Sequence, residues 1–249
     1  MSRPTKSQTQ GKGKVTDGGR YVFLVYNLKA MGIKKGRSTQ MTEIIRIKGG
    51  TDNCYLVTDG ENAILVDTAS KEYLSQVIGK CDKYKMKLIV LTHVHFDHAE
   101  NAAELSKRYD IPVALHKSDE ELFESFDKQP LKSYGIVGKV VLGLSLKVLR
   151  QTKVERPENI IYIKEGDGLN AYGINAKFIE LPGHTLGSIG VDVEEKHLIV
   201  GDALDNWISP GTGHLYFDKE ALYKSEDKIR NLGERTIYYG HGKPTANRK

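Results

Sequence analysis

Apolar residues in this chain recur in short runs that have the length of β-strands. Turn-forming residues separate the runs, and one separator, Asp59-Gly60-Glu61-Asn62, predicts a hairpin. The pattern predicts strands at 43–47, 53–58, 63–67, 87–91, 111–115, 160–163, 176–181, 188–193, 197–200 and 236–239. Strands therefore extend over nearly all of the chain after Met41.

Helical spacing appears between the strands. Ser70 stands where a helix cap is expected, before the first helical stretch. The stretches with this spacing are 70–79, 99–109, 116–126 and 218–232, and in the second of them Ala102, Ala103, Leu105 and Ser106 share one face. Strands with helices, followed again by strands with helices, predict two stacked sheets covered by helices. We expect an α/β (α+β) fold, a four-layer αββα sandwich in one domain.

Residues 132–150 are harder to interpret. They carry enough apolar residues for a helix that is hydrophobic over much of its circumference, but Gly138 and Gly143 weaken that interpretation. The apolar positions are Val137, Val140, Val141, Leu144, Leu146, Val148 and Leu149. A lid or substrate wall, a buried packing helix and a dimer contact all remain open.

Composition adds limits to this picture. The 249 residues are 39% hydrophobic and 28% charged, as in ordinary globular chains. No apolar run approaches the roughly 18 residues that a membrane helix needs, and the start has no secretory signal. The two cysteines, Cys54 and Cys81, do not make a disulfide framework and suggest reduced thiols. We therefore expect a cytoplasmic protein with no membrane partner.

The net charge of +5 is unevenly distributed. Residues 1–40 hold nine Lys or Arg and one acidic residue, Asp17, whereas 41–249 hold 28 basic and 31 acidic residues, a balance of −3. We interpret 1–40 as a disordered basic leader, or as an over-extended start with Met41 as the initiator, and 41–249 as the functional domain. Segment 21–28 could add a strand. The mildly acidic body argues against a nucleic-acid partner.

One short stretch contains several side chains that could bind a metal. His93-Val94-His95-Phe96-Asp97-His98, here called the signature turn, follows the strand at 87–91 and precedes the helix at 99–109. A tight turn can bring three imidazoles and a carboxylate together, which a regular helix or strand would spread over several faces. Imidazole with carboxylate suits zinc, iron or manganese. The signature turn thus predicts a metal site.

Three further strands end in a polar residue beside glycine. His184 follows Pro182-Gly183, Asp202 follows Gly201, and His241 lies between Gly240 and Gly242. A small neighbour lets backbone crowd a metal ion. Each position alone is weak evidence, but with the signature turn they make seven candidate ligands for two metals.

Together these motifs resemble the metallo-β-lactamase-fold hydrolase superfamily, above all its glyoxalase II-like branch. The resemblance covers about residues 42–246. It implies one metal on His93, His95 and His184, a second on Asp97, His98 and His241, and Asp202 bridging both. It also implies that Asp67 orients ligands, although Ala69 stands where glycine is common.

The remaining histidines match no ligand position of the family. We expect His116 and His197 to be structural or on the surface. His214 follows Asp202 in the same loop and could face substrate, although a surface position is the preferred interpretation.

The resemblance implies two divalent ions, zinc first with iron or manganese as alternatives, that share a hydroxide nucleophile. Asp202 and Asp97 would be catalytic, with Asp97 passing a proton to the leaving group. We expect a hydrolase of small thioesters or esters, with a homodimer possible. The alternatives are a lactonase, a one-iron persulfide dioxygenase and, less favoured, an RNase Z-type nuclease.

Three departures narrow the function. β-Lactamases of this fold often carry cysteine or serine at the position of Asp202, which argues against antibiotic hydrolysis. Glyoxalase II proper adds a helical domain that holds glutathione, and only eight residues follow His241, which puts glutathione recognition in question. Flavodiiron proteins have a glutamate in the signature and a flavodoxin domain, and this sequence has neither.

Overall fold

The computed structural model describes residues 42–149 and 151–247. The predictions for the leader, including the strand at 21–28, lie outside these residues and stay predictions. Within the described residues, no helix has the length and apolar content needed to cross a membrane.

The first sheet has the order β1-β2-β3-β4-β5-β7. Its first three strands form an antiparallel meander, and β3, β4, β5 and β7 run parallel. The bounds are β1 (Glu43–Gly49), β2 (Asp52–Thr58), β3 (Asn62–Val66), β4 (Lys85–Val90), β5 (Val113–His116) and β7 (Ile160–Ile163). The parallel strands point their carboxyl ends at one edge, which is where the signature turn emerges after β4.

The second sheet has the order β15-β14-β10-β9-β8. Within it β10 and β14 are parallel, and the other pairs are antiparallel. The bounds are β8 (Ala176–Glu180), β9 (Ile189–Val193), β10 (His197–Gly201), β14 (Arg235–Tyr239) and β15 (Thr245–Asn247). Two small ribbons pair β6 (Lys132–Ser133) with β13 (Leu215–Tyr216), and β11 (Leu204–Asp205) with β12 (Gly211–Thr212).

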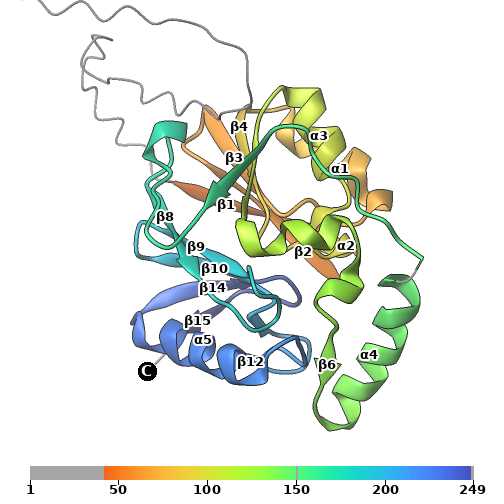
Figure 1. Cartoon of the computed structure of the whole chain (residues 1–249). Coiled ribbons are helices and arrows are strands. Elements are labelled where there is room, and N and C mark those ends of the chain that lie inside the picture. Colours follow the sequence, from red (N-terminus) through yellow and green to blue (C-terminus); the bar gives the residue numbers. More distant parts are fainter. Residues whose placement is uncertain (1–41, 150, 248–249) are drawn as a thin grey trace, which may run out of the picture. The chain divides into compact units, whose positions relative to one another are not determined.

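Alternation of side chains builds the layers (Figure 1). Between the two sheets, Val66 and Val90 of the first pack in one buried cluster with Val191 and Ile199 of the second. On the outer face of the first sheet, Leu65 and Ile89 share a cluster with helices α1 (Leu74–Cys81) and α3 (Ala102–Tyr109). On the outer face of the second, Leu198 and Ile237 pack with Ile229 of α5 (Lys219–Asn231). The predicted αββα sandwich is confirmed.

The helices depart from prediction near the site. The stretch at 70–79 starts as a 3-10 turn (Lys71–Tyr73) before α1. Ser70 occupies the predicted N-cap position of this turn, but its side chain makes no capping hydrogen bond. The helix predicted at 99–109 starts later, as α3, and a short helix, α2 (Phe96–Ala99), begins already in the signature turn. Between the two helices, Asn101 turns its amide to the carbonyls of Thr68, Ala69 and Ser70.

The stretch at 116–126 is also not an α-helix. It forms two 3-10 turns, Lys117–Phe123 and Phe126–Lys128. The His116 side chain accepts a hydrogen bond from the Ser118 amide at its start, and the carboxylate of Asp119 is engaged by other loops. Tertiary contacts outweigh the local helical spacing here.

The ambiguous stretch does form a helix, α4 (Gly135–Leu149), set apart from both sheets in Figure 1. Ile136, Val140 and Leu144 are exposed, so the buried-packing interpretation is wrong. The substrate-wall interpretation is taken up below.

Candidate metal centre

The seven candidate ligands converge at one edge of the sandwich. The signature turn follows β4, and the other three follow β8, β10 and β14. Three overlapping groups each bring their ligand atoms within 4.8 Å of one another: His93, His95 and His184; His93, His98 and Asp202; Asp97, His98 and His241. The carboxyl ends of four strands, one in the first sheet and three in the second, thus gather residues from positions 93 to 241 into one cluster.

Glycine makes this approach possible. A Cβ on Gly240 would overlap the Asp202 carboxylate and lie 2.7 Å from Cε1 of His98. Gly183, just before His184, has a φ of +137° and would press a Cβ into the backbone of Leu222. A side chain at Gly240 would displace cluster residues, and one at Gly183 would push the loop of His184 away from Leu222 of α5.

The first group is a set of edge-to-face imidazoles. The ring centroids of His93 and His95 are 4.8 Å apart, and those of His93 and His184 are 4.6 Å apart. Nδ1 of His95 lies 2.9 Å from Nε2 of His184. All three side chains are buried, so their nitrogen lone pairs share one small enclosed space.

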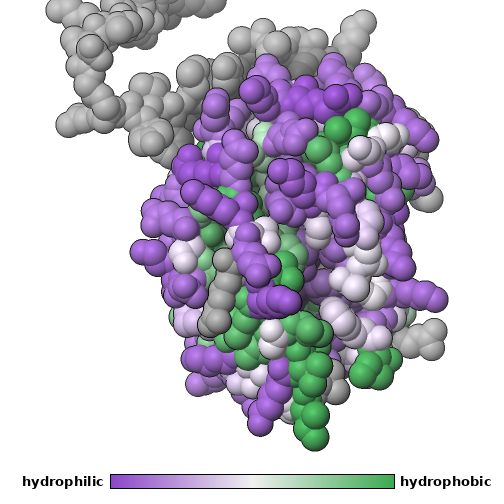
Figure 2. All heavy atoms as spheres, turned by 90° about the vertical axis from the view of Figure 1, so that its right-hand side faces the viewer, coloured by the Kyte–Doolittle hydropathy of each residue, from purple (hydrophilic) through white to green (hydrophobic). Residues whose placement is uncertain are grey.

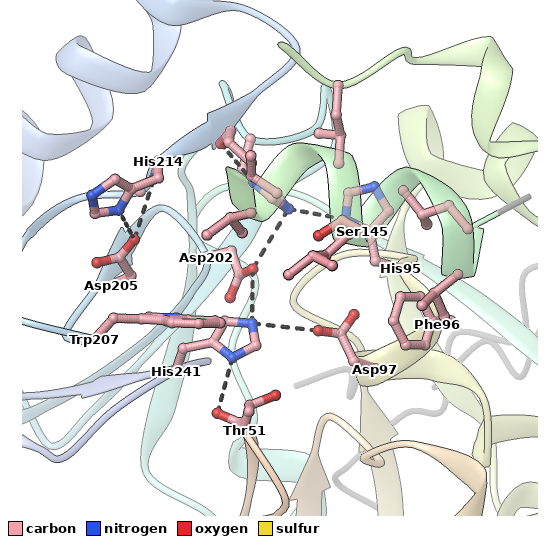
Figure 3. Close-up of a pocket in the computed structure, with 18 of the residues that line it drawn as sticks. Thr51, His95, Phe96, Asp97, Ser145, Asp202, Asp205, Trp207, His214 and His241 are labelled. Carbon is pink, nitrogen blue, oxygen red and sulfur yellow. Dashed lines mark hydrogen bonds and ion pairs between the residues drawn. The ribbon is translucent and has the colours of Figure 1, made fainter. Parts of the chain in front are cut away.

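The second group combines a carboxylate with two imidazoles. Oδ2 of Asp97 lies 3.3 Å from Nε2 of His241 and 3.7 Å from Nε2 of His98. The Asp202 carboxylate stands between the groups, as Figure 3 shows for Asp97, Asp202 and His241. Its Oδ2 is 3.7 Å from Nε2 of His184 and 3.4 Å from Nε2 of His241, and its Oδ1 is 3.4 Å from Nε2 of His98.

Hydrogen bonds fix how the rings face. Nδ1 of His184 donates to the Leu215 carbonyl over 2.9 Å, and Nδ1 of His241 donates to the Thr51 carbonyl over 3.0 Å. Nδ1 of His98 lies 2.9 Å from Oδ2 of Asp67. Tying one ring nitrogen in this way sets the tautomer and turns the other toward the cluster.

Several polar atoms of the cluster are buried and unpaired. Nε2 of His93, His95 and His98 and Oδ1 of Asp202 are buried and have no hydrogen-bond partner among the described residues. Buried polar atoms are nearly always paired, so a cluster of unpaired ones needs an explanation. Neutral imidazoles with carboxylates are a donor set for divalent transition metals, and the residues fit such ions.

The electrostatics of His93 and His95 agree with that donor set. At His98 and His241, burial lowers the pKa but the neighbouring carboxylates, Asp202 and Asp97 among them, raise it above its usual value. Burial lowers the pKa of His95 to about 3, with further lowering from the neighbouring His184, and burial likewise depresses the pKa of His93. Both rings are therefore neutral, which leaves a lone pair to donate. Burial alone would raise the pKa of Asp97, but His98 and His241 lower it to about 2, so this carboxylate is ionised.

Asp67 lies directly behind the cluster. Its Oδ1 accepts a hydrogen bond from the Thr92 amide over 2.8 Å, and its Oδ2 faces His98. Asp67 and Ala69 have φ angles of 61° and 59°. A left-handed conformation costs roughly 1–2 kcal/mol for a residue with a Cβ, so the backbone is strained at both positions.

Sequence reasoning missed Asp119. This fully buried carboxylate accepts hydrogen bonds from the Thr185 hydroxyl (2.7 Å), the Gly187 amide (2.7 Å) and the Val94 amide (3.3 Å). Burial raises its pKa to about 6. It therefore ties the loop of His184 to the signature turn. In the sequence it belongs to the acidic run Asp119-Glu120-Glu121, and nothing local distinguishes it.

The three unassigned histidines have different positions. Nε2 of His116 lies 3.4 Å from Oε1 of Glu180, and Nδ1 of His197 lies 3.2 Å from the Tyr238 hydroxyl. Both positions are as expected for structural or surface residues. His214 is half-buried on the wall of a pocket, so its preferred surface interpretation was wrong. Its Nδ1 is 2.7 Å from Oδ2 of Asp205, and its ring stacks on Tyr134.

The pocket has a volume of about 240 Å³ and opens beside the cluster (Figure 3). Cluster residues His95, Asp97, His184, Asp202 and His241 form one wall. Another wall comes from α4, through Val141, Leu144, Ser145, Val148 and Leu149, and Trp207 and Ile208 add to the lining. This placement favours the substrate-wall interpretation of α4.

Comparisons with known proteins agree with the geometry. The family model of the metallo-beta-lactamase superfamily matches residues 47–241. Hydroxyacylglutathione hydrolase GloC of Haemophilus influenzae is 31% identical over 213 residues, which cover 82% of this chain and 92% of that protein.

Two solved structures share the fold. The BLEG-1 B3 metallo-beta-lactamase has a TM-score of 0.61 and 23% identity, covering 83% of this chain and 94% of its own. TTHA1623, in a di-iron-bound form, has a TM-score of 0.57 and 23% identity, covering 82% of this chain and 94% of its own. The family match spans the signature turn and the cluster residues beyond it, and the chain belongs to the metallo-beta-lactamase superfamily as one of its hydrolases.

Proposed function

We propose that this chain is a dinuclear metal-dependent hydrolase of small thioesters or esters. The observation that carries the proposal is the position of Asp202, whose two oxygens face histidines of both groups. A carboxylate between two metals offsets their mutual repulsion and lets both lie close to one water. The relative named hydroxyacylglutathione hydrolase supports a thioester as the substrate class.

The ligands divide as the resemblance implies. His93, His95 and His184 would hold the first ion, Asp97, His98 and His241 the second, and Asp202 both. Zinc suits imidazole and carboxylate ligands, and iron and manganese accept the same set. The di-iron form of TTHA1623 supports a place for two ions in this fold.

A bound metal pair would lower the pKa of a shared water to about 7, and this water would be the nucleophile. The chain's own residues do the rest. Asp97 lines the pocket and is the group best placed to carry a proton to the leaving group. Asp67 and Asp119 keep the ligand turns in position through their hydrogen bonds.

Metal analysis of the purified protein, combined with a panel of thioester, lactone and phosphodiester substrates, tests this proposal. We expect two divalent ions per chain and hydrolysis of thioesters. Preferred hydrolysis of lactones would leave the dinuclear site in place but change the substrate class, and preferred cleavage of phosphodiesters would favour the nuclease.

Variants of the second group distinguish the proposed hydrolase from a one-iron dioxygenase. Asp97→Ala and His241→Ala should each lower the metal content and abolish hydrolysis, because both side chains belong to the second group. A one-iron enzyme would keep its iron on His93, His184 and Asp202 and would retain oxygen-dependent activity in both variants. One iron per chain with oxygen consumption on a persulfide would overturn the proposal.

A further inference from the structure

An apolar stripe runs along the outside of α4. Ile136, Val140, Leu144 and Val148 follow one another at a spacing of four residues and are 84%, 60%, 67% and 40% exposed. Residues four apart lie on the same face of a helix. In Figure 2 hydrophobic side chains gather on the lower part of the face where α4 lies. A contiguous exposed apolar surface of this kind usually marks a binding site.

The stripe leads into the pocket of the metal centre. Leu144 and Val148 line that pocket, whereas Ile136 does not. Trp207, half exposed, lines the same pocket and packs its ring 5.2 Å from that of His241. An apolar group that entered between α4 and Trp207 would therefore reach the cluster.

The charges of the pocket also restrict its ligand. Among the described residues that line it there is no lysine or arginine, and its carboxylates are Asp97, Asp202 and Asp205. Anionic groups are normally bound by arginine, lysine or backbone amides at helix starts. A thiol carrier with free carboxylates, such as glutathione, would find no cationic side chain on these walls.

Space continues on the other side of α4. A second cavity of about 280 Å³ borders Leu146 and Leu149 of the helix together with Phe123 and Phe126. His95, Leu131 and Leu149 line both cavities. The helix thus borders open space along two sides, of which the one facing the metal centre is mainly apolar, and both spaces meet at a histidine of the cluster.

We propose that the acyl part of the substrate is an apolar chain that lies along α4, and that its thiol part carries no carboxylate. This rests on the proposed function. Hydrolysis breaks the carbon–sulfur bond, bonds the oxygen of water to the acyl carbon and leaves a proton on the thiol. α4 then acts as the wall that selects the acyl chain.

Binding can be measured apart from catalysis. Trp207 is the chain's only tryptophan, so intrinsic fluorescence reports on this pocket. The probes are thioethers that cannot be hydrolysed: S-hexyl-N-acetylcysteamine, its S-methyl analogue and S-hexylglutathione. Each buried methylene strengthens binding about fourfold. The hexyl probe has five methylenes more than the methyl probe, so even their partial burial should lower its Kd at least tenfold relative to the methyl probe.

The glutathione probe should bind no more tightly than the hexyl N-acetylcysteamine probe. Equal Kd values for the hexyl and methyl probes, or clearly tighter binding of the glutathione probe, would overturn the inference.

The stripe supplies a matched pair of variants. Leu144→Asn should weaken binding of the hexyl probe about fivefold, whereas Ile136→Asn, on the same face but outside the pocket, should leave it unchanged. Both positions are exposed, so both variants should fold. Equal effects of the two variants would overturn the inference. The inference would also be overturned if wild type were a dimer in solution and both variants were monomers, because the stripe would then be covered by a second copy of the chain.

Kinetics separates this inference from the proposed function. Wild-type protein should hydrolyse the hexanoyl thioester of N-acetylcysteamine with a kcat/KM at least tenfold above that of the acetyl thioester, and Leu144→Asn should lower this ratio. Hydrolysis of both at equal rates would overturn the acyl-chain inference and leave the function standing. Selective binding of the hexyl probe without hydrolysis of either thioester would overturn the function alone.

Discussion

The metal centre and the α4 wall of the pocket are built in opposite ways. In the centre, His93, His98 and His184 are at most 2% exposed, and each has Nδ1 within hydrogen-bonding distance of a fixed partner. On the wall, Leu144 is 67% exposed, and cavities border α4 on two sides. Strand ends hold the candidate ligands rigidly, whereas the helix that we propose to contact the substrate has few constraints.

This difference has a physical basis. The ends of β4, β8, β10 and β14 are fixed by sheet hydrogen bonds, so the turns that follow them inherit their positions. Buried carboxylates then tie the turns to one another. α4 follows the two-residue ribbon of β6 and β13, belongs to neither main sheet and leaves most of its apolar stripe exposed.

The largest effect is expected at the middle of the centre. Asp202→Ala should lower the metal content and reduce turnover by several orders of magnitude, because its carboxylate faces both groups. Asp205→Asn, in the same pocket but outside the cluster, should keep the metal content of wild type. Metal analysis per chain and steady-state kinetics measure both. Unchanged metal content in Asp202→Ala would contradict the bridging role.

Asp119 tests how rigidly the centre is held. Burial raises its pKa from 3.8 to about 6, so between these values the folded chain keeps a proton that the unfolded chain releases. The unfolding free energy should therefore fall as pH rises through this window, by up to roughly 3 kcal/mol from this group. Asp119→Asn removes the dependence.

Urea unfolding of both proteins at pH 4 and pH 7 measures this effect. The unfolding free energy of wild type minus that of Asp119→Asn should be smaller at pH 7 than at pH 4. The same difference at both pH values would show that the carboxyl does not titrate in this window.

Asp67 should act on metal affinity. Replacing a carboxylate that orients a ligating histidine typically costs 10–100-fold in affinity, and Asp67→Asn should fall in this range because Oδ2 faces His98. Competition with a chelator of known affinity measures it. Asp192→Asn is the matched control, since this buried carboxylate pairs with Arg235 and touches no cluster residue. Equal losses in both variants would indicate general destabilisation.

The smallest effect is expected on the wall. Leu144→Ala should change the unfolding free energy by no more than about 0.5 kcal/mol, because the side chain is mostly exposed. The same substitution at Leu198, which is fully buried, should cost about 2–5 kcal/mol. Chemical denaturation of the two variants compares them directly. A large loss at Leu144 would mean that α4 is as tightly packed as the core.

The same contrast explains what sequence could predict. Strand runs and the turns that end them carry local signals, so the sandwich and the cluster of His93, His184 and His241 could be predicted. Asp119 could not, because its role depends on hydrogen bonds to Val94 and Thr185, which lie 25 residues before and 66 residues after it. His214 was misjudged for a similar reason: its place on the pocket wall depends on Asp205 and Tyr134.

Anomalous scattering from crystals reconstituted with zinc tests the central claim most directly. The account predicts two peaks about 3.5–4 Å apart. One should lie among His93, His95 and His184, the other among Asp97, His98 and His241, with Asp202 in contact with both. A single peak, or a second one bound away from Asp97 and His241, would contradict a dinuclear centre in this protein.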